Sequence, residues 1–303
     1  MEINNKNAKY DLIIIIFILL ISSVIIKKPK IIPKVCLCVV GRQENRYAKE
    51  YVEHYKNLGY NHIFIYDNNN KDEEKFSDVL QEEINEGYVT IIDFRGKRDN
   101  RSQEHAYSDC YQKNKYEYNW LSFFDFDEFL ELHQKNFTIQ DYLSQDIFKR
   151  CQNVKVNWIM YISEKETLYY ENKPLKIRFP KPVYDDYTFN MHTKSTVVGG
   201  QRRNYWSRLD NPHCSLHTFK ACSASGHNAN YRSPFIDPPD FRYAAIRHYH
   251  FKSFEEYCLK LKRGFPDAVS ALPRIQSLIR EHSGNKDKVK IMEKVFNISI
   301  TPI

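Results

Sequence analysis

The sequence predicts an α/β fold in which helices flank a mostly parallel sheet. From residue 35 onward, an apolar strand-like run is followed three times by a polar turn and then by a helix-like segment. This alternation is typical of parallel strands joined by right-handed crossovers. The chain has 303 residues, which suits one large domain, and its aromatic content of 15% excludes a disordered chain.

The first strand is predicted over residues 35–40, whose sequence VCLCVV has no polar side and fits a strand buried on both faces. Gly41 opens a polar loop, and the following helix ends at Gly59. One side of this helix is apolar and is expected to face the core, and it consists of Tyr47, Ala48, Tyr51, Val52, Tyr55 and Leu58.

The second and third repeats keep the same order. A strand over residues 62–66 precedes a helix that runs from about Asp72 to Gly87. A strand over residues 88–94 then precedes a helix for which Ser102 is the expected N-cap. Both repeats therefore extend the parallel sheet by one strand.

The fourth strand, predicted over residues 120–126, ends in an acidic cluster. Asp125 and Asp127 stand two residues apart, and Glu128 follows directly. In an extended chain this spacing directs both aspartates to one face. Because acids repel one another in an aromatic segment of low dielectric, we expect a cation to compensate them, with Glu128 holding the turn.

The pattern loosens beyond residue 130. A short helix is expected from Thr138, a strand over residues 155–161, and a strand over residues 247–251 before a helix capped by Ser253. That helix ends in three basic residues, which are either a solvated face complementing the helix dipole or part of a binding site: Lys260, Lys262 and Arg263.

Ligands of such sheets bind at the carboxyl ends of the strands, and polar residues gather there in this sequence. They follow the four strands in order as Arg42 with Glu44, Asp67 with Asn68, Arg95, and Asp125 with Asp127. The first turn lacks the glycine-rich loops of dinucleotide-binding and P-loop proteins, which excludes both classes. The net charge of +7 comes largely from lysines near residue 30, so a dedicated nucleic-acid binder is excluded as well.

The N-terminal segment is expected to anchor the protein in a membrane. Residues 12–26 form an uncharged apolar run, and a short basic stem with two prolines follows up to residue 34. We therefore expect residues 1–34 to be a tail, a signal anchor and a stem, and residues 35–303 to be the functional domain. A type II orientation in the lumen of the Golgi or endoplasmic reticulum is expected, although the lysines after the run also fit a cytosolic domain.

The seven cysteines are odd in number and define no disulfide framework. Cys36 and Cys38 share one face of the first strand, a spacing that suits buried thiols better than a bridge. A disulfide between Cys214 and Cys222 is one interpretation of the later cysteines in a lumenal domain. The alternative is a small zinc site made by Cys214, His217, Cys222 and His227.

Taken in order, the motifs resemble glycosyltransferase family 92 and related family 2-like enzymes. The likeness covers about residues 35–265 and implies a GT-A fold, a nucleotide-sugar donor and a divalent cation, Mn²⁺ or Mg²⁺. It also implies that residues 35–130 bind the donor and residues 131–303 form the acceptor side. The motifs are Arg42-x-Glu44, Glu50-Tyr51-x-x-His54-Tyr55, Tyr66-Asp67-Asn68, Asp125-x-Asp127-Glu128-Phe129, Arg247-His248-Tyr249 and Lys262-Arg263-Gly264.

The resemblance further implies roles for individual residues. The cation would be ligated by Asp127 and His248, with Asp125 near the ribose and the metal. The donor pocket would be lined by Arg42, Glu44, Asp67, Asn68 and Gln103. After Trp158 the chain departs from the family pattern, which leaves the acceptor open. An inverting mechanism needs a carboxylate base, and the candidates are Glu164, Glu166, Asp185 and Asp186.

The sequence thus predicts a metal-dependent, inverting hexosyltransferase. It would move a hexose, with galactose as one candidate, from a UDP-sugar to a glycan or glycoprotein. A nucleotidyltransferase, which attacks phosphorus with a similar fold and acid pair, is the first alternative. A catalytically inactive, membrane-anchored glycan-binding protein is the second, and the presence of the acids and His248 speaks against it.

Overall fold

The computed structural model describes residues 32–96, 101–162, 167–169, 173–184, 188–200, 211–214, 220–264 and 271–300. The chain divides into two units, residues 1–32 and 33–303, and all described residues except Ile32 belong to the second. The expected anchor at 12–26 lies outside the described residues. Within the described ranges, no helix combines the length and the apolar character needed to cross a membrane.

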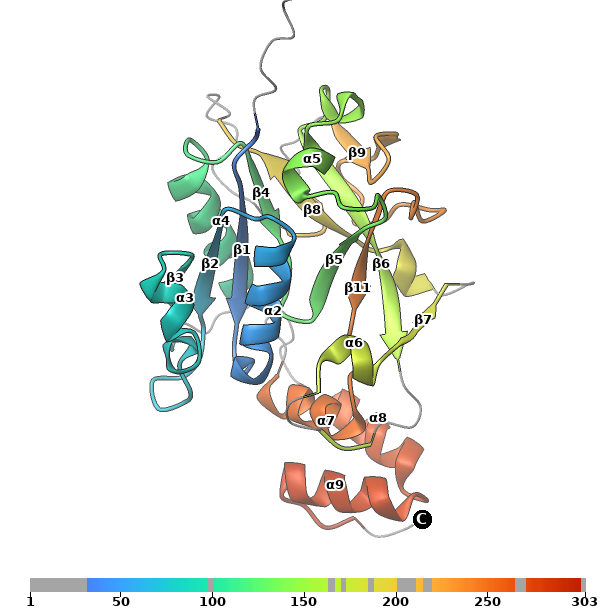
Figure 1. The fold of residues 1–303 in the computed structure, drawn as a ribbon. Helices are drawn as coiled ribbons and strands as arrows, with labels where there is room; N and C mark the ends of the chain where they lie inside the picture. Colours follow the sequence, from blue (N-terminus) through green and yellow to red (C-terminus); the bar gives the residue numbers. More distant parts are fainter. Residues whose placement is uncertain are drawn as a thin grey trace, which may run out of the picture. The chain divides into compact units, whose positions relative to one another are not determined.

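Strands and helices alternate in the first half of the second unit, as predicted (Figure 1). These elements are β1 Val35–Gly41, α2 Asn45–Asn57, β2 His62–Asp67, η1 Phe76–Asp78, α3 Gln81–Asn85, β3 Val89–Asp93, α4 Ser102–Asn114, β4 Trp120–Phe123 and β5 Glu128–Leu132.

The second half holds shorter strands and ends in three helices. Its elements are α5 Ile139–Leu143, η2 Asp146–Phe148, β6 Asn153–Ile162, α6 Leu175–Arg178, β7 Lys181–Val183, η3 Thr188–Met191, β8 Thr193–Val198, β9 Ala221–Ser223, β10 Asn228–Ala229, β11 Ala244–His248, α7 Phe254–Arg263, α8 Leu272–His282 and α9 Lys286–Phe296.

The described strands join in one mixed sheet. Strands β3, β2, β1 and β4 lie side by side and parallel, in that order. Beyond β4 the directions mix, because β8 runs antiparallel to both β4 and β6, while β11 pairs parallel with β6 and antiparallel with β5. The α/β class with a central sheet is therefore confirmed, but only the first four strands of the chain form a continuous parallel block, and parallel and antiparallel pairs alternate beyond it.

The helix predicted from Asp72 to Gly87 is instead two short pieces, η1 and α3. The backbone of Lys75 is extended, with φ −122° and ψ 140°, which stops a continuous helix. The Glu73 carboxylate accepts hydrogen bonds from the Asn70 backbone and side chain, at 2.8 and 2.7 Å, so this loop is organised by local side-chain bonds. Its apolar residues still point inward, and Phe76 is fully buried.

A disulfide joins β1 to α4, between Cys38 and Cys110. The prediction that Cys38 is a buried thiol is therefore wrong, whereas Cys36 is a buried free thiol. Helix α4 packs against the face of β1 on which these cysteines lie, and this contact brings together two sulfurs that are 72 residues apart in the sequence.

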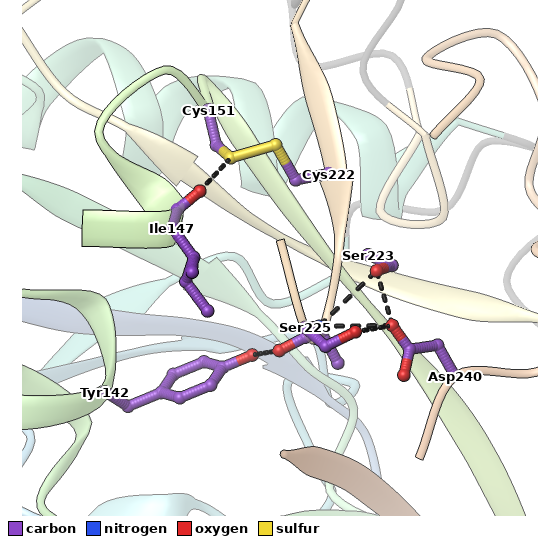
Figure 2. The surroundings of a disulfide bond; sticks show 8 residues. Tyr142, Ile147, Cys151, Cys222, Ser223, Ser225 and Asp240 are labelled. Atoms are coloured by element: carbon purple, nitrogen blue, oxygen red, sulfur yellow. Dashed lines mark hydrogen bonds between the residues drawn. A yellow bond between two sulfur atoms is a disulfide. The ribbon is translucent and has the colours of Figure 1, made fainter. Parts of the chain in front are cut away.

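A second disulfide, Cys151–Cys222, joins the segment before β6 to β9 (Figure 2). The predicted Cys214–Cys222 bridge is wrong, and Cys214 is a buried thiol. The zinc interpretation also fails at Cys222, because a sulfur in a disulfide is no thiolate ligand; His217 lies outside the described residues. Next to the disulfide, Ser223 and Ser225 donate hydrogen bonds to Asp240, which fixes the chain after β9.

Candidate functional site

The acidic cluster lies in a turn between β4 and β5. The predicted strand 120–126 stops at Phe123, because the Asp125 amide donates to Glu128 Oε2 at 2.8 Å and the Glu128 amide donates to the Asp125 carbonyl at 3.0 Å. Because β4 ends at Phe123 and β5 begins at Glu128, the two aspartates lie in the turn and not on one face of a strand. Each aspartate meets a different group of charged residues.

Asp125 is held by residues of β8 and α4. Lys194 Nζ lies 2.7 Å from Asp125 Oδ2, and the side chains of Gln103 and Tyr107 each donate to Oδ1 at 2.9 Å. Burial alone would raise the pKa of Asp125, but the Lys194 ammonium lowers it below the usual range. Gln103 and Asp125, each expected near the donor, are thus in direct contact, and Lys194 compensates the charge of Asp125.

Glu128 shares the same lysine. Its carboxylate lies 3.4 Å from Lys194 Nζ, and both side chains are fully buried. Burial raises the pKa of Glu128 well above its usual value, since one ammonium cannot fully compensate two acids. Glu128 holds the turn through its bond to the Asp125 amide, in agreement with the structural role predicted for it.

Asp127 is held by the C-terminal part of the chain. Lys260 Nζ of α7 lies 2.8 Å from Oδ2, Lys252 Nζ lies 4.0 Å from the same atom, and His248 Nε2 lies 3.5 Å from Oδ1. Burial alone would raise the pKa of Asp127, but Lys260 and then His248 lower it well below the usual range. The solvated-face interpretation is thus wrong for Lys260, although Lys262 is exposed.

Asp127 and two histidines form a group of three potential metal ligands. One ligand atom each from Asp127, His248 and His250 lies within 4.8 Å of the others. Burial lowers the pKa of His248, and burial with the nearby Lys260 lowers that of His250 to about 2, so both imidazoles are neutral and able to bind a metal. The buried Nδ1 atom of His248 has no hydrogen-bond partner among the described residues, which also fits a ligand role.

The predicted and observed ligand sets differ at two positions. Asp125 is not in this group, since its carboxylate is taken by Lys194. His250 was not predicted, yet it lies two residues after His248 in the strand expected over 247–251, where alternate side chains share a face. That spacing was the signal available in the sequence.

Lys260 already contacts two of the three potential ligands. Besides Asp127, its ammonium lies 3.2 Å from His250 Nδ1. The donor set of one carboxylate and two imidazoles fits Mn²⁺ or a similar divalent cation. A cation bound by all three groups would therefore compete with the Lys260 ammonium for Asp127 and His250.

Arg42 and Glu44, the residues predicted to line a nucleotide pocket, lie against the end of α7. Arg42 Nη1 donates to the Arg263 carbonyl at 3.0 Å, and Arg42 Nη2 pairs with Glu73 Oε1 at 3.1 Å. Glu44 pairs with Arg263 and lies 3.7 Å from Lys252 Nζ. The loop after β1 is therefore linked to Asp127 through Lys252, which lies near both Glu44 and Asp127, and through α7, which carries Lys260 and Arg263.

Asp67 and Asn68 organise the loop after β2. The buried Asp67 carboxylate accepts from the Asn69 backbone and side chain at 3.1 and 2.8 Å, and Asn68 Nδ2 donates to the Phe94 carbonyl at 3.1 Å. Their roles in nucleotide binding stay predictions. The candidate bases lie outside the described residues: Glu164, Glu166, Asp185 and Asp186.

Comparison with protein families gives one match. The sequence model of glycosyltransferase family 92 matches residues 34–197, which is more than half of the chain. A family 92 protein of Arabidopsis thaliana is 31% identical over 107 residues, which are 34% of this chain and 17% of the relative. A rice protein of the same family is 31% identical over 110 residues, 36% of this chain and 18% of the relative. The matched region thus spans less than a fifth of these curated relatives.

The chain also has a weak likeness to several solved structures. Residues 1–349 of S. aureus TarS in complex with UDP align over 88% of this chain and 72% of that one, with a TM-score of 0.41 and 7% identity. The galactosyltransferase LgtC in complex with donor and acceptor sugar analogs aligns over 71% of this chain and 87% of that one, with a TM-score of 0.34 and 11% identity.

Proposed function

The chain belongs to glycosyltransferase family 92, and from that premise we propose that it is a metal-dependent hexosyltransferase with a GT-A fold. The donor would be a UDP-sugar and the acceptor a glycan or glycoprotein, with inversion at the transferred carbon. The cation, Mn²⁺ or Mg²⁺, would be held by Asp127, His248 and His250. The choice of UDP follows from the family resemblance of the nucleotide-pocket motifs.

The observation that carries this proposal is the cluster of three potential metal ligands at the end of β11 and in the turn after β4. A divalent cation in such a site neutralises the charge that develops on a departing diphosphate. The neutral state of both histidines leaves a nitrogen lone pair on each for a metal, and the depressed pKa of Asp127 keeps its carboxylate ionised.

The charges around the cluster also suit a diphosphate. Asp127 and Glu44 are surrounded by three cationic side chains, those of Lys252, Lys260 and Arg263. Protein residues therefore supply one positive charge in excess before any metal binds. With a divalent cation added, the excess rises to about three, which complements the negative charge of a nucleoside diphosphate.

Asp125 would take a second role at the same site. Its side chain is 32% exposed while its lysine partner is fully buried, so one edge of an ionised carboxylate faces outward. We propose that this edge contacts the ribose of the donor, with Gln103 and Tyr107 fixing its orientation. The acceptor base would come from Glu164 or Asp186, as the sequence suggests.

The membrane anchor at residues 12–26 and a lumenal, type II orientation form part of this proposal. The two disulfides support the orientation, because such bonds persist in oxidising compartments and are rare in the cytosol.

Titration of UDP with and without Mn²⁺ tests the proposal. For the wild-type protein we expect Mn²⁺ to tighten UDP binding by about tenfold or more, as a bridging cation does. Asp127→Asn should lose most of this gain, because the amide is a poorer ligand for a hard cation. Calorimetry or fluorescence would measure both affinities.

Asp146→Asn is the matched control. It makes the same chemical change on a side chain that is 83% exposed. It should behave like the wild type. A wild-type affinity for UDP that is indifferent to Mn²⁺ would reject the metal-bridged donor. If UDP binds in that way, a screen of UDP-sugars for hydrolysis would then identify the donor.

A further inference from the structure

Two phenylalanines reach the surface close to the candidate site. Phe189 of η3 is 44% exposed and Phe235 is 41% exposed. His192 lies between them, stacked on Phe189 with ring centroids 5.9 Å apart and in edge contact with Phe235 at 4.6 Å. We call Phe189, His192 and Phe235 the aromatic patch.

The aromatic patch is held rigidly. His192 and Phe235 face each other across an antiparallel bridge, and the His192 amide donates to the Phe189 carbonyl at 3.1 Å. Beneath the patch, the Trp158 ring of β6 stacks on His192 at a centroid distance of 4.9 Å and an angle of 14°. These rings are therefore fixed before any ligand arrives, which lowers the entropic cost of binding.

The patch is also continuous with the candidate metal cluster. The same Trp158 ring lies 4.2 Å from the ring of His248, measured between centroids. Two residues after His192, Lys194 contacts Asp125. Trp158 of β6 therefore links the patch to His248, and the start of β8 links it to the Lys194–Asp125 pair.

The chemistry of the patch suits a sugar ring. Burial lowers the pKa of His192, so at neutral pH all three rings are uncharged. Uncharged aromatic faces attract the C–H face of a pyranose, while its hydroxyl groups remain in water. The exposed parts of two phenylalanines amount to about 200 Å², far below the ~800 Å² per partner of a stable protein interface.

We propose that the aromatic patch is a carbohydrate subsite that stacks a hexose ring of the acceptor next to the donor. The identification of this hexose as the acceptor rests on the proposed function, whereas binding of a hexose does not. Phe189 and Phe235 would supply the stacking surface, and Trp158 would position His192 between them.

Saturation-transfer NMR with methyl glucoside, methyl galactoside and methyl mannoside tests the subsite. We expect at least one of the three to receive saturation at its ring protons in the wild-type protein. The double variant Phe189→Ala with Phe235→Ala should reduce that signal at least about fivefold, whereas Phe189→Tyr with Phe235→Tyr, which keeps both rings, should retain it. A matched thermal melt of the variants would show that the fold is intact.

Tyr116→Ala is the control, because Tyr116 is 70% exposed and precedes β4, at the opposite ends of the parallel strands. The inference is overturned if none of the three glycosides binds, or if the signal survives in the alanine double variant. Measuring UDP affinity in the same samples separates the two proposals. Loss of glycoside binding with normal UDP binding supports the subsite, while glycoside binding without any UDP binding would leave the subsite standing and reject the transferase.

Discussion

Asp125 and Asp127 are two residues apart in the sequence, yet they belong to two differently built regions. The partners of Asp125 are Gln103, Tyr107 and Lys194, and all lie within the segment matched by the family model. The partners of Asp127 come from residues 248–260, beyond that segment.

The two aspartates differ in whether their lysine partner can be replaced. Asp125 is bound by an ammonium that is fully buried and shared with Glu128, so this lysine cannot leave without stranding two acids. Asp127 faces a mixture of ammonium and imidazole groups, and a metal could replace its contact with Lys260. We infer that the Asp125 region maintains the turn and that the Asp127 region changes on ligand binding.

The largest effect should come from Lys194→Met. Removing the ammonium leaves the fully buried Glu128 beside the partly exposed Asp125 without compensation, which should cost about 3–5 kcal/mol of the free energy of unfolding. Urea denaturation would measure it. Lys262→Met, on an exposed side chain, should change stability by less than about 0.5 kcal/mol. Equal losses in the two variants would contradict the fixed role of Lys194.

A smaller effect is expected when the pH is lowered, because an acidic residue holds α7, the helix that carries Lys260. Glu256 of α7 accepts from Arg178 Nη1 at 3.0 Å and from Tyr47. Burial alone would raise the pKa of Glu256, but these bonds, with that of Ser253, lower it to about 2. A folded-state pKa below the unfolded value stabilises the protein above pH 4.5, and this stabilisation is lost as the pH falls toward 2.

The stability advantage of the wild type over Glu256→Gln should therefore shrink by about 2 kcal/mol between pH 5 and pH 3. Urea denaturation of both proteins at the two pH values measures this difference, and other acids cancel in it. An advantage that stays constant with pH would show that Glu256 does not hold α7 through its charge.

The smallest effect concerns competition at Asp127. In Lys260→Met the ammonium no longer contacts Asp127 and His250, so we expect Mn²⁺ to bind about tenfold more tightly, or about 1.4 kcal/mol. Electron paramagnetic resonance of free Mn²⁺ measures this without any substrate. Lys262→Met on the same helix should leave the affinity unchanged, and weaker Mn²⁺ binding in Lys260→Met would mean that Lys260 supports the site instead of competing for it.

Local patterns predicted the elements that depend on neighbouring residues. The strands over 35–40 and 62–66 and the helix after Gly41 lie where periodicity placed them, and Ser253 caps α7 as its Ser-x-x-Glu motif indicates. The helix over 72–87 was mispredicted, because side-chain bonds of Glu73 and the extended Lys75 override its apolar spacing. The antiparallel part of the sheet has no local signal, since strand direction beyond β4 depends on pairing between distant segments.

The sequence by itself determined the family, the α/β class and the position of the acidic cluster, because ordered motifs and apolar periodicity are local properties of the chain. Only the tertiary structure decided which cation each acid meets and which cysteines pair. Lys194 and Lys260 contact the aspartates from 69 and 133 positions away, and a ligand atom of His250 lies within 4.8 Å of one of Asp127. Such partners are selected by burial, since a buried carboxylate is stable only where the fold brings a compensating charge to it.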